Sequence, residues 1–129
     1  MILLDTHIWF WWVQDTGRLS EAQRNQLQVG EADGLGVSVI SCWEIAMLVA
    51  KKRLVLSDSI DDWMRQALNY PGIRRLQLTP RIALESTRLP GDFHADPADR
   101  IIVATARTRD LLLMTNDIRI RDYAHVRLA

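Results

Sequence analysis

The sequence predicts an α/β fold, a three-layer α/β/α sandwich whose central sheet is mostly parallel. Short unbroken apolar runs, at residues 2–4 and 111–114, are typical of strands that are buried on both faces. Helical segments separate the predicted strands, and no two strands are joined by the short turn of a hairpin. Because residues 2–4 and 111–114 are the most uniformly apolar strands, we expect them at the centre of the sheet.

The predicted elements alternate along the whole chain. The predicted strands are residues 2–4, 37–40, 74–78 and 111–114, with a short fifth candidate at 125–128. The predicted helices lie at residues 8–13, 20 to about 29, 45–50, about 58 to 69, 81–89 and 97–106.

Capping residues mark where several of these helices begin. Thr6 is expected to cap the first helix, and Ser20 the second, because both hydroxyls can accept a backbone N–H bond. Thr79-Pro80 and Asp96-Pro97 each place a capping side chain before a proline at the first helical position, where proline is tolerated. These signals place the helices of the second half more firmly than periodicity alone.

Length and composition limit the protein class. At 129 residues we expect one domain spanning residues 1–129. The 16 basic and 16 acidic residues balance, so a nucleic-acid partner would need local basic patches. The single cysteine, Cys42, excludes an internal disulfide framework and a cysteine-rich zinc site, and it fits the cytoplasm. The apolar run at residues 8–13 is too short for a signal peptide or a membrane span, so no membrane association is expected.

Four acidic residues are candidates for one site: Asp5, Glu44, Asp99 and Asp117. Two of them follow predicted strands, and the other two lie near predicted helix starts. In open α/β sheets both positions border the crevice at the carboxyl ends of the strands. Clustered carboxylates repel one another, and a hard divalent cation removes that repulsion. Their oxygen ligands favour Mg²⁺ or Mn²⁺.

Each acid also has a purely structural interpretation. Ser41 and Glu44 have the spacing of a capping box, and Asp99 lies at the same spacing behind Asp96. Asp117 follows Asn116, and either residue is a common turn former. The three histidines lack the spacing of a zinc site: His7, His94 and His125.

The aromatic run Trp9-Phe10-Trp11-Trp12 has two open interpretations. One helix cannot direct four consecutive large side chains into a single core. Some of them therefore cover a neighbouring helix inside the fold, or they form a surface for a dimer or another partner. The sequence alone leaves both alternatives standing.

Four motifs, in order, resemble the PIN-domain ribonucleases, specifically the VapC-type toxins of bacterial toxin–antitoxin systems. The matching stretches are residues 3–7, 39–46, 94–106 and 114–117, and the resemblance spans essentially the whole chain. The family implies a PIN-like α/β fold in which Asp5, Glu44, Asp99 and Asp117 hold Mg²⁺ or Mn²⁺. Thr115 matches a hydroxyl residue that often accompanies the last acid, and Asp96 is expected chiefly as a helix cap.

The resemblance also implies a function and partners. Such enzymes cleave single-stranded or looped RNA by metal-dependent hydrolysis, and they form homodimers that an antitoxin protein inhibits. Basic residues are dispersed, and the candidates for the RNA path are Lys51, Lys52, Arg53, Arg74 and Arg75. Two other classes remain open. A metal-dependent phosphatase would carry a second aspartate where this chain has His7, and a non-catalytic binding module can share the fold.

Overall fold

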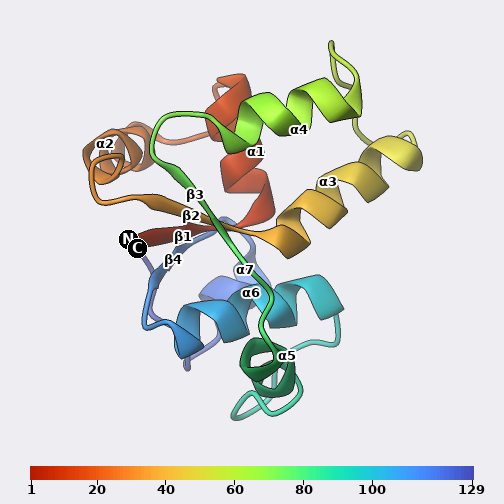
Figure 1. The fold of residues 1–129 in the computed structure, drawn as a ribbon. Coiled ribbons are helices and arrows are strands. Elements are labelled where there is room, and N and C mark those ends of the chain that lie inside the picture. Colours follow the sequence, from red (N-terminus) through yellow and green to blue (C-terminus); the bar gives the residue numbers. More distant parts are fainter.

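The computed structural model describes residues 1–129 and contains a four-stranded sheet in the order β3-β2-β1-β4 (Figure 1). All three strand pairings are parallel, so the carboxyl ends of the strands share one edge. The strands are β1 (Ile2–Leu4), β2 (Leu35–Ser38), β3 (Ile73–Leu76) and β4 (Leu112–Met114).

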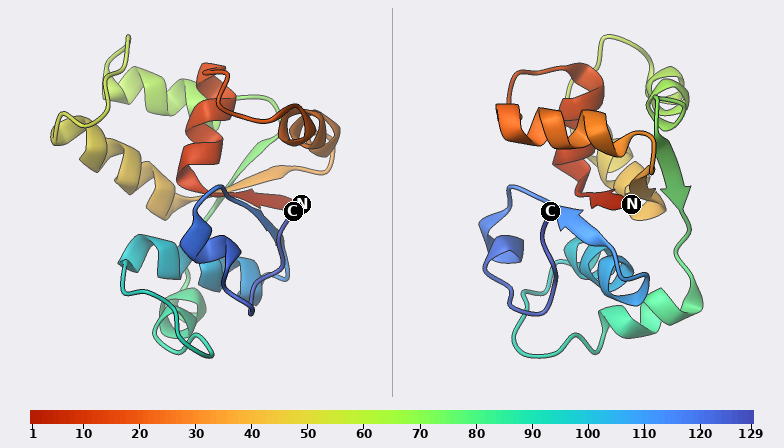
Figure 2. Two further views of the ribbon diagram at one scale, coloured as in Figure 1. Left: turned by 180° about the vertical axis from the view of Figure 1, so that it is seen from behind. Right: turned by 90° about the vertical axis from the view of Figure 1, so that its left-hand side faces the viewer.

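Helices cover both faces of the sheet, which confirms the predicted three-layer α/β/α sandwich (Figures 1 and 2). One face carries α1 (Thr6–Gln14), α2 (Glu21–Gly30), α3 (Val39–Ala50) and α4 (Ile60–Leu68). The other face carries α5 (Pro80–Ser86), α6 (Pro97–Thr108) and α7 (Ile118–Arg121). None of the helices combines the length and the apolar character that crossing a membrane requires.

The sheet divides the buried side chains into two cores. Leu4 and Met114 belong to the core shared with α1 and α3, whereas Leu3 and Leu113 belong to the core shared with α6. Successive side chains of a strand point to opposite faces, so each short apolar strand supplies both cores. This explains why β1 and β4 are apolar at every position rather than alternating.

The expected centre of the sheet is right for β1 and wrong for β4. β1 lies between β2 and β4, but β4 is the last of the four strands. Its outer side is covered by the C-terminal segment, because Leu113 N–H donates to the Arg127 carbonyl and Ala129 N–H donates to the Leu113 carbonyl, both at 2.9 Å. The predicted fifth strand is reduced to one bridge between Leu113 and Leu128.

Two helix starts differ from the prediction. Asp5 rather than Thr6 caps α1, with the Thr6 N–H donating to Asp5 Oδ1 at 2.8 Å. Ser38 caps α3, so the predicted strand at residues 37–40 was wrong beyond Ser38, and Ile40 N–H donates to the Ser38 hydroxyl. As a result, the hydroxyls of Thr6 and Ser41 are free for other contacts. The caps predicted at Ser20, Thr79 and Asp96 are confirmed.

The aromatic run of α1 is partly core. Trp9 is fully buried, its indole N–H donates to the Ala67 carbonyl, and its ring lies 5.2 Å from that of Trp63. Phe10 also packs against Trp63. Trp11 and Trp12 remain half-buried. The core interpretation therefore holds for Trp9 and Phe10, and the partner interpretation concerns only the last two tryptophans.

Candidate metal-binding active site

The predicted acids converge on the edge of the sheet where β1 and β4 end. Asp5 directly follows β1, and Asp117 caps α7 just after β4. Asp99 lies in the first turn of α6. Glu44 lies in the second turn of α3, one turn later than predicted, because α3 begins at Val39. Asp5, Glu44 and Asp117 lie close enough to Asp99 for their negative charges to raise its pKa.

Asp5 is the most firmly held member of this group. It is 6% exposed, its backbone N–H donates to the Met114 carbonyl at 3.0 Å, and its two carboxylate oxygens have different partners. Thr6 N–H donates to Oδ1, and the buried Thr115 hydroxyl donates to Oδ2 at 2.6 Å. Burial raises the pKa of Asp5 above its ordinary value, although the bonds from Thr115 and Thr6 oppose the rise. The prediction that Thr115 accompanies the acids agrees with this contact.

A small hydroxyl network holds Glu44. The Thr6 hydroxyl donates to Glu44 Oε1 at 2.5 Å and also lies 2.8 Å from the Ser41 hydroxyl. The capping-box interpretation of Glu44 is therefore wrong: Ser38 is the cap, and Glu44 reaches across to α1. Burial raises the pKa of Glu44, and nearby Asp5 raises it further.

Burial and neighbouring carboxylates disfavour the ionised form of Asp99. Asp96 caps α6 by accepting the Asp99 N–H at 3.0 Å, so the Asp99 side chain itself is not needed for capping. The Asp99 residue is only 7% exposed. Burial, followed by the neighbouring carboxylates of Asp5 and Asp96, raises the pKa of Asp99 to about 7.

Two basic side chains approach Asp99. His94 Nε2 lies 3.1 Å from Asp99 Oδ2, but the pair lacks the alignment of a hydrogen bond, and Nε2 has no other partner. Arg119 Nη2 lies 3.6 Å from the same oxygen. Neither contact removes the upward shift of the pKa of Asp99, because burial and four carboxylates outweigh them.

Asp117 is paired within the chain. The Arg119 guanidinium donates from Nη2 to Asp117 Oδ2 at 3.0 Å and from Nε to Oδ1 at 3.3 Å. This hydrogen bonding lowers the pKa of Asp117 below its ordinary value. Arg119 thus spans Asp117 and Asp99, and it brings a positive charge to the edge of the acidic site.

The donor chemistry of this site fits a hard divalent cation. The available ligands are carboxylate oxygens, and the raised pKa of Asp99 shows that another negative charge is costly there. No three acidic, histidine or cysteine side chains approach closely enough to hold one ion entirely by themselves. Mg²⁺ commonly retains several waters and binds through only one or two carboxylates. One or two of these acids would therefore be enough to hold it.

Sequence reasoning missed several residues of this site. Thr6 and Ser41 were interpreted as caps, and their side chains instead connect α1 to α3. His94 and Arg119 were not identified as neighbours of the acids. The one available signal for Arg119 was its position two residues after Asp117, where a side chain can fold back onto a capping carboxylate.

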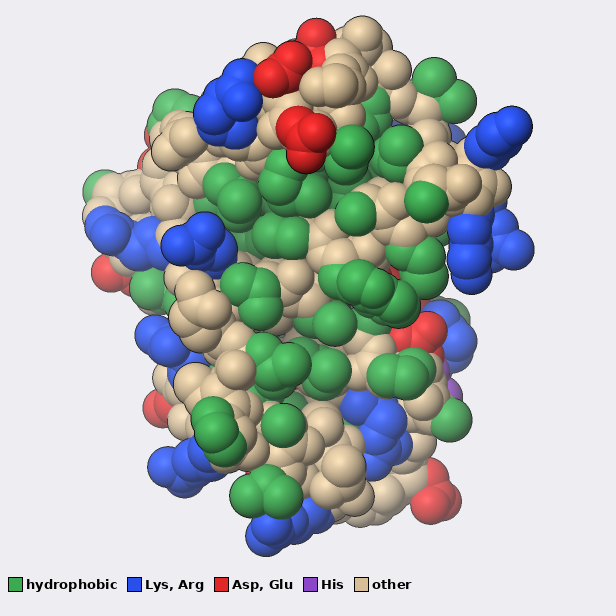
Figure 3. Space-filling view, turned by 45° about the vertical axis from the view of Figure 1, so that its right-hand side comes forward, with side chains coloured by type: hydrophobic (Ala, Val, Ile, Leu, Met, Phe, Trp, Pro, Cys, Tyr) green, Lys and Arg blue, Asp and Glu red, His purple; other side chains and the backbone are tan.

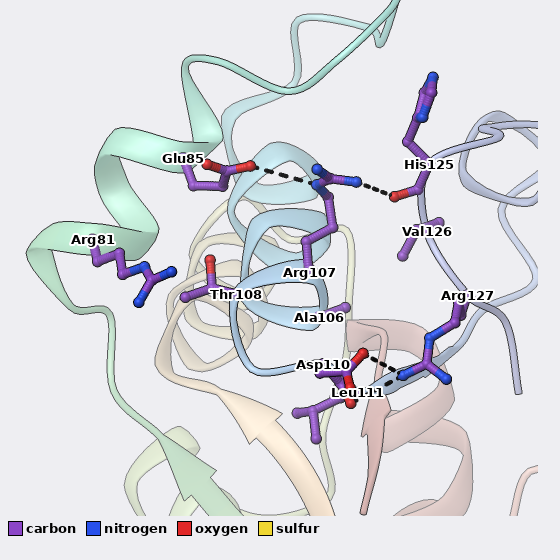
Figure 4. Close-up of a pocket in the computed structure, with 10 residues that line it drawn as sticks. All are labelled: Arg81, Glu85, Ala106, Arg107, Thr108, Asp110, Leu111, His125, Val126 and Arg127. Atoms are coloured by element: carbon purple, nitrogen blue, oxygen red, sulfur yellow. Dashed lines mark hydrogen bonds and ion pairs between the residues drawn. The ribbon is translucent and has the colours of Figure 1, made fainter.

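A different pocket, of about 300 Å³, lies at the opposite end of β4 (Figure 4). Its charged groups are largely paired with each other. Arg107 lies 3.5 Å from Glu85 and donates to the His125 carbonyl, and Arg127 bonds to Asp110. We assign no chemistry to it, because it contains none of the four candidate acids.

Comparisons with known proteins agree with this geometry. A family model described as the PIN domain matches residues 2–126. The chain is 36% identical over 126 residues to a Mycobacterium tuberculosis protein named Ribonuclease VapC22, across 98% of this chain and 94% of that protein.

Solved structures share the fold. VapBC2 from Rickettsia felis, crystallised with a DNA fragment from its promoter, matches with a TM-score of 0.73 and 16% identity, over 100% of this chain and 98% of that one. A toxin–antitoxin complex from Klebsiella pneumoniae matches with a TM-score of 0.62 and 25% identity, over 96% of this chain and 91% of that one.

The raised pKa of Asp99 predicts how stability depends on pH. Between its ordinary value of 3.8 and about 7, folded Asp99 keeps a proton that the unfolded chain has released. The free energy of unfolding of metal-free protein should therefore fall as the pH rises through this window, and Asp5 and Glu44 should add to the fall. Urea unfolding in EDTA at about pH 5 and about pH 7.5 measures it.

The matched variant is Asp99→Asn, which keeps the backbone N–H bond to Asp96. Its unfolding free energy should depend less steeply on pH, and at neutral pH it should exceed that of the unsubstituted chain. An equal pH dependence of the unfolding free energy in both proteins would show that the pKa of Asp99 is not raised in the folded chain.

Proposed function

Because the chain belongs to the PIN-domain family, we propose that it is a metal-dependent endoribonuclease and the toxin of a toxin–antitoxin pair. Residues 1–129 form one nuclease domain in this proposal. It hydrolyses phosphodiester bonds of single-stranded or looped RNA in the cytoplasm. The identity to a protein named as a ribonuclease supports the reaction class.

The observation that carries the proposal is the burial of Asp5 and Asp99 at a strand end and a helix start, where Glu44 and Asp117 also act on Asp99. Natural folds rarely gather repelling carboxylates at a buried edge without a ligand that offsets them. A structural role alone explains Asp96, which caps α6, but it does not explain the buried side chain of Asp99. A bound cation does.

We assign roles by how each acid is held. Asp5 and Asp99 are the direct ligands of Mg²⁺ or Mn²⁺, because both are nearly buried and their positions are fixed at a strand end and a helix start. Glu44 and Asp117, at the periphery, orient the attacking water and complete the site. A divalent ion supplies activation of water at neutral pH and stabilisation of charge on the leaving 3′ oxygen.

The hydroxyl network prepares this site for its ligand. Thr115 and Thr6 each occupy one oxygen of Asp5 and fix the orientation of its carboxylate. Thr6 also fixes Glu44 relative to Asp5. Such supporting bonds to a ligating carboxylate typically change metal affinity or activity by about 10- to 100-fold when they are removed.

We also propose two protein partners, an antitoxin and a second copy of this chain. The related structure from Klebsiella pneumoniae is a toxin–antitoxin complex. The surface supports docking, since Trp43 of α3 and Leu84 of α5 are 54% and 55% exposed. Figure 3 shows hydrophobic side chains gathered across one face of the molecule. A basic side chain of the antitoxin would compete with the metal for the acids.

Replacement of Asp5 or Asp99 by asparagine tests the reaction. Each change keeps the size of the side chain but removes a charged ligand, and the amide oxygen that Asp5→Asn introduces can still cap α1. Purified protein should cleave RNA with Mg²⁺ or Mn²⁺ and stop in EDTA, and each variant should lose activity by about 10²-fold or more. The control is Asp61→Asn, an exposed acid at the start of α4. Full activity in excess chelator would reject the mechanism.

Arg119→Gln tests whether the Arg119 guanidinium competes with a metal ion for the acids. Because Arg119 neutralises Asp117 and approaches Asp99, its removal should leave these acids freer to bind a cation. Titration calorimetry with Mn²⁺ should show tighter binding, by several-fold. Arg88→Gln, a change at an exposed arginine that forms no ion pair with the acids, gives the control for net charge. Weaker Mn²⁺ binding in Arg119→Gln alone would assign Arg119 to holding the site together instead.

Light scattering after size-exclusion chromatography tests the partners. The chain alone should elute as a dimer, and with the product of its neighbouring gene it should form a larger complex. The substitution Trp43→Ser should weaken one of these assemblies, because it removes an exposed aromatic side chain from the docking surface. A strict monomer that ignores the neighbouring gene product would reject both partners and leave the nuclease proposal intact.

A further inference from the structure

A second cavity opens directly beside the acids. It has a volume of about 320 Å³, and two of its lining residues are Asp5 and Asp117. The others are not acidic. We call these four residues the aromatic subsite: His7, Trp11, Arg18 and Asn116.

The aromatic subsite is assembled from three segments. His7 and Trp11 lie four residues apart on α1 and so share one face of that helix. Arg18 comes from the loop between α1 and α2, and Asn116 from the loop between β4 and α7. The end of β1, through α1, therefore positions His7 and Trp11, and the end of β4 positions Asn116.

In the aromatic subsite, two aromatic rings lie beside each other and a guanidinium lies near one of them. The rings of His7 and Trp11 have centroids 5.8 Å apart, and the Arg18 guanidinium lies 5.8 Å from the Trp11 ring centroid. Trp11 packs partly against the core, which fixes its position, while His7 and Arg18 are exposed. The Asn116 side-chain oxygen accepts from Gln23, so its amide N–H groups are available.

Core packing alone does not account for this arrangement. Trp9 and Phe10 fill the core, and Trp12 packs edge-on against Tyr70. Trp11 instead shares its exposed side with two polar, solvent-facing residues. A half-buried indole under a guanidinium, at the mouth of an acidic site, has the features of a ligand contact.

We propose that the aromatic subsite binds a nucleobase of the RNA beside the bond that is cleaved, with the base stacked on Trp11. This inference rests on the proposed function. Proteins bind single-stranded RNA by stacking bases on aromatic rings, which tolerates any sequence because every base has a flat face. Arg18 supplies the positive charge that a phosphodiester needs next to four carboxylates, and Asn116 donates to the edge of the base.

Trp12→Leu provides a matched control for Trp11→Leu. Both residues are half-buried tryptophans on α1, but Trp12 does not line the cavity. In an Asp99→Asn background, which is expected to be inactive, fluorescence anisotropy measures binding of labelled octauridylate without cleavage. Trp11→Leu should weaken binding by about tenfold, equivalent to about 1.4 kcal/mol, while Trp12→Leu should change it less than about twofold. Trp11→Phe should restore most of the affinity.

Photocrosslinking gives a readout that needs no change at Trp11. An octamer carrying 5-iodouridine should crosslink to the peptide that contains Trp11, and Arg18→Gln should weaken binding and reduce the yield. Equal affinities in Trp11→Leu and Trp12→Leu, or crosslinks confined to other peptides, would overturn the subsite. So would a failure of octauridylate to bind.

The outcomes separate the two proposals. If the unsubstituted chain cleaves RNA with Mg²⁺ but Trp11→Leu behaves as Trp12→Leu does, only the aromatic subsite is wrong. If the chain has no metal-dependent nuclease activity, the proposed function fails, and the subsite as a place beside a cleaved bond fails with it.

Discussion

The main physical constraint on this structure is the repulsion among carboxylates that a parallel sheet brings to one edge. Parallel pairing of β1 with β4 places Asp5 and Asp117 at neighbouring strand ends, and helix starts add Asp99 nearby. Burial then raises the pKa of Asp99 to about 7. Holding these carboxylates close together and out of water costs stability in the free protein. In the proposed function, a divalent cation bound by these carboxylates would offset that cost.

The remainder of the site limits this repulsion without removing it. Thr115 and the Thr6 N–H stabilise the ionised form of Asp5, and Arg119 does the same for Asp117. Asp99 receives no comparable bond, and burial together with the neighbouring carboxylates raises its pKa to about 7. A divalent ion bound by these carboxylates would offset their repulsion, so its binding would also stabilise the folded chain.

Helix α1 contacts both the hydrophobic core and the acidic site. Its inward side chains, Trp9 and Phe10, pack against Trp63 and fix the helix in place. Its first residue, Thr6, reaches Glu44, and its outer face presents Trp11 beside the acids. One run of aromatic residues therefore both fills the core and lines the cavity beside the acids. Because the buried face of α1 is packed, the ring of Trp11 has a defined position.

The sequence by itself determined the layer architecture and β1 inside the sheet, because apolar strands and helix caps are local signals. It also singled out the four acids as candidates for one site, which stays a prediction. It misplaced β4, because a C-terminal segment, close only in space, covers the edge of that strand. It left a capping box of Ser41 with Glu44 open as an alternative to the acidic site, and only the tertiary structure rejects it, because Ser38 caps α3 and the packing of α3 against α1 brings Glu44 to Thr6. Contacts such as that of Arg119 with Asp99 join side chains 20 residues apart, so their geometry is decided when the helices pack around the sheet.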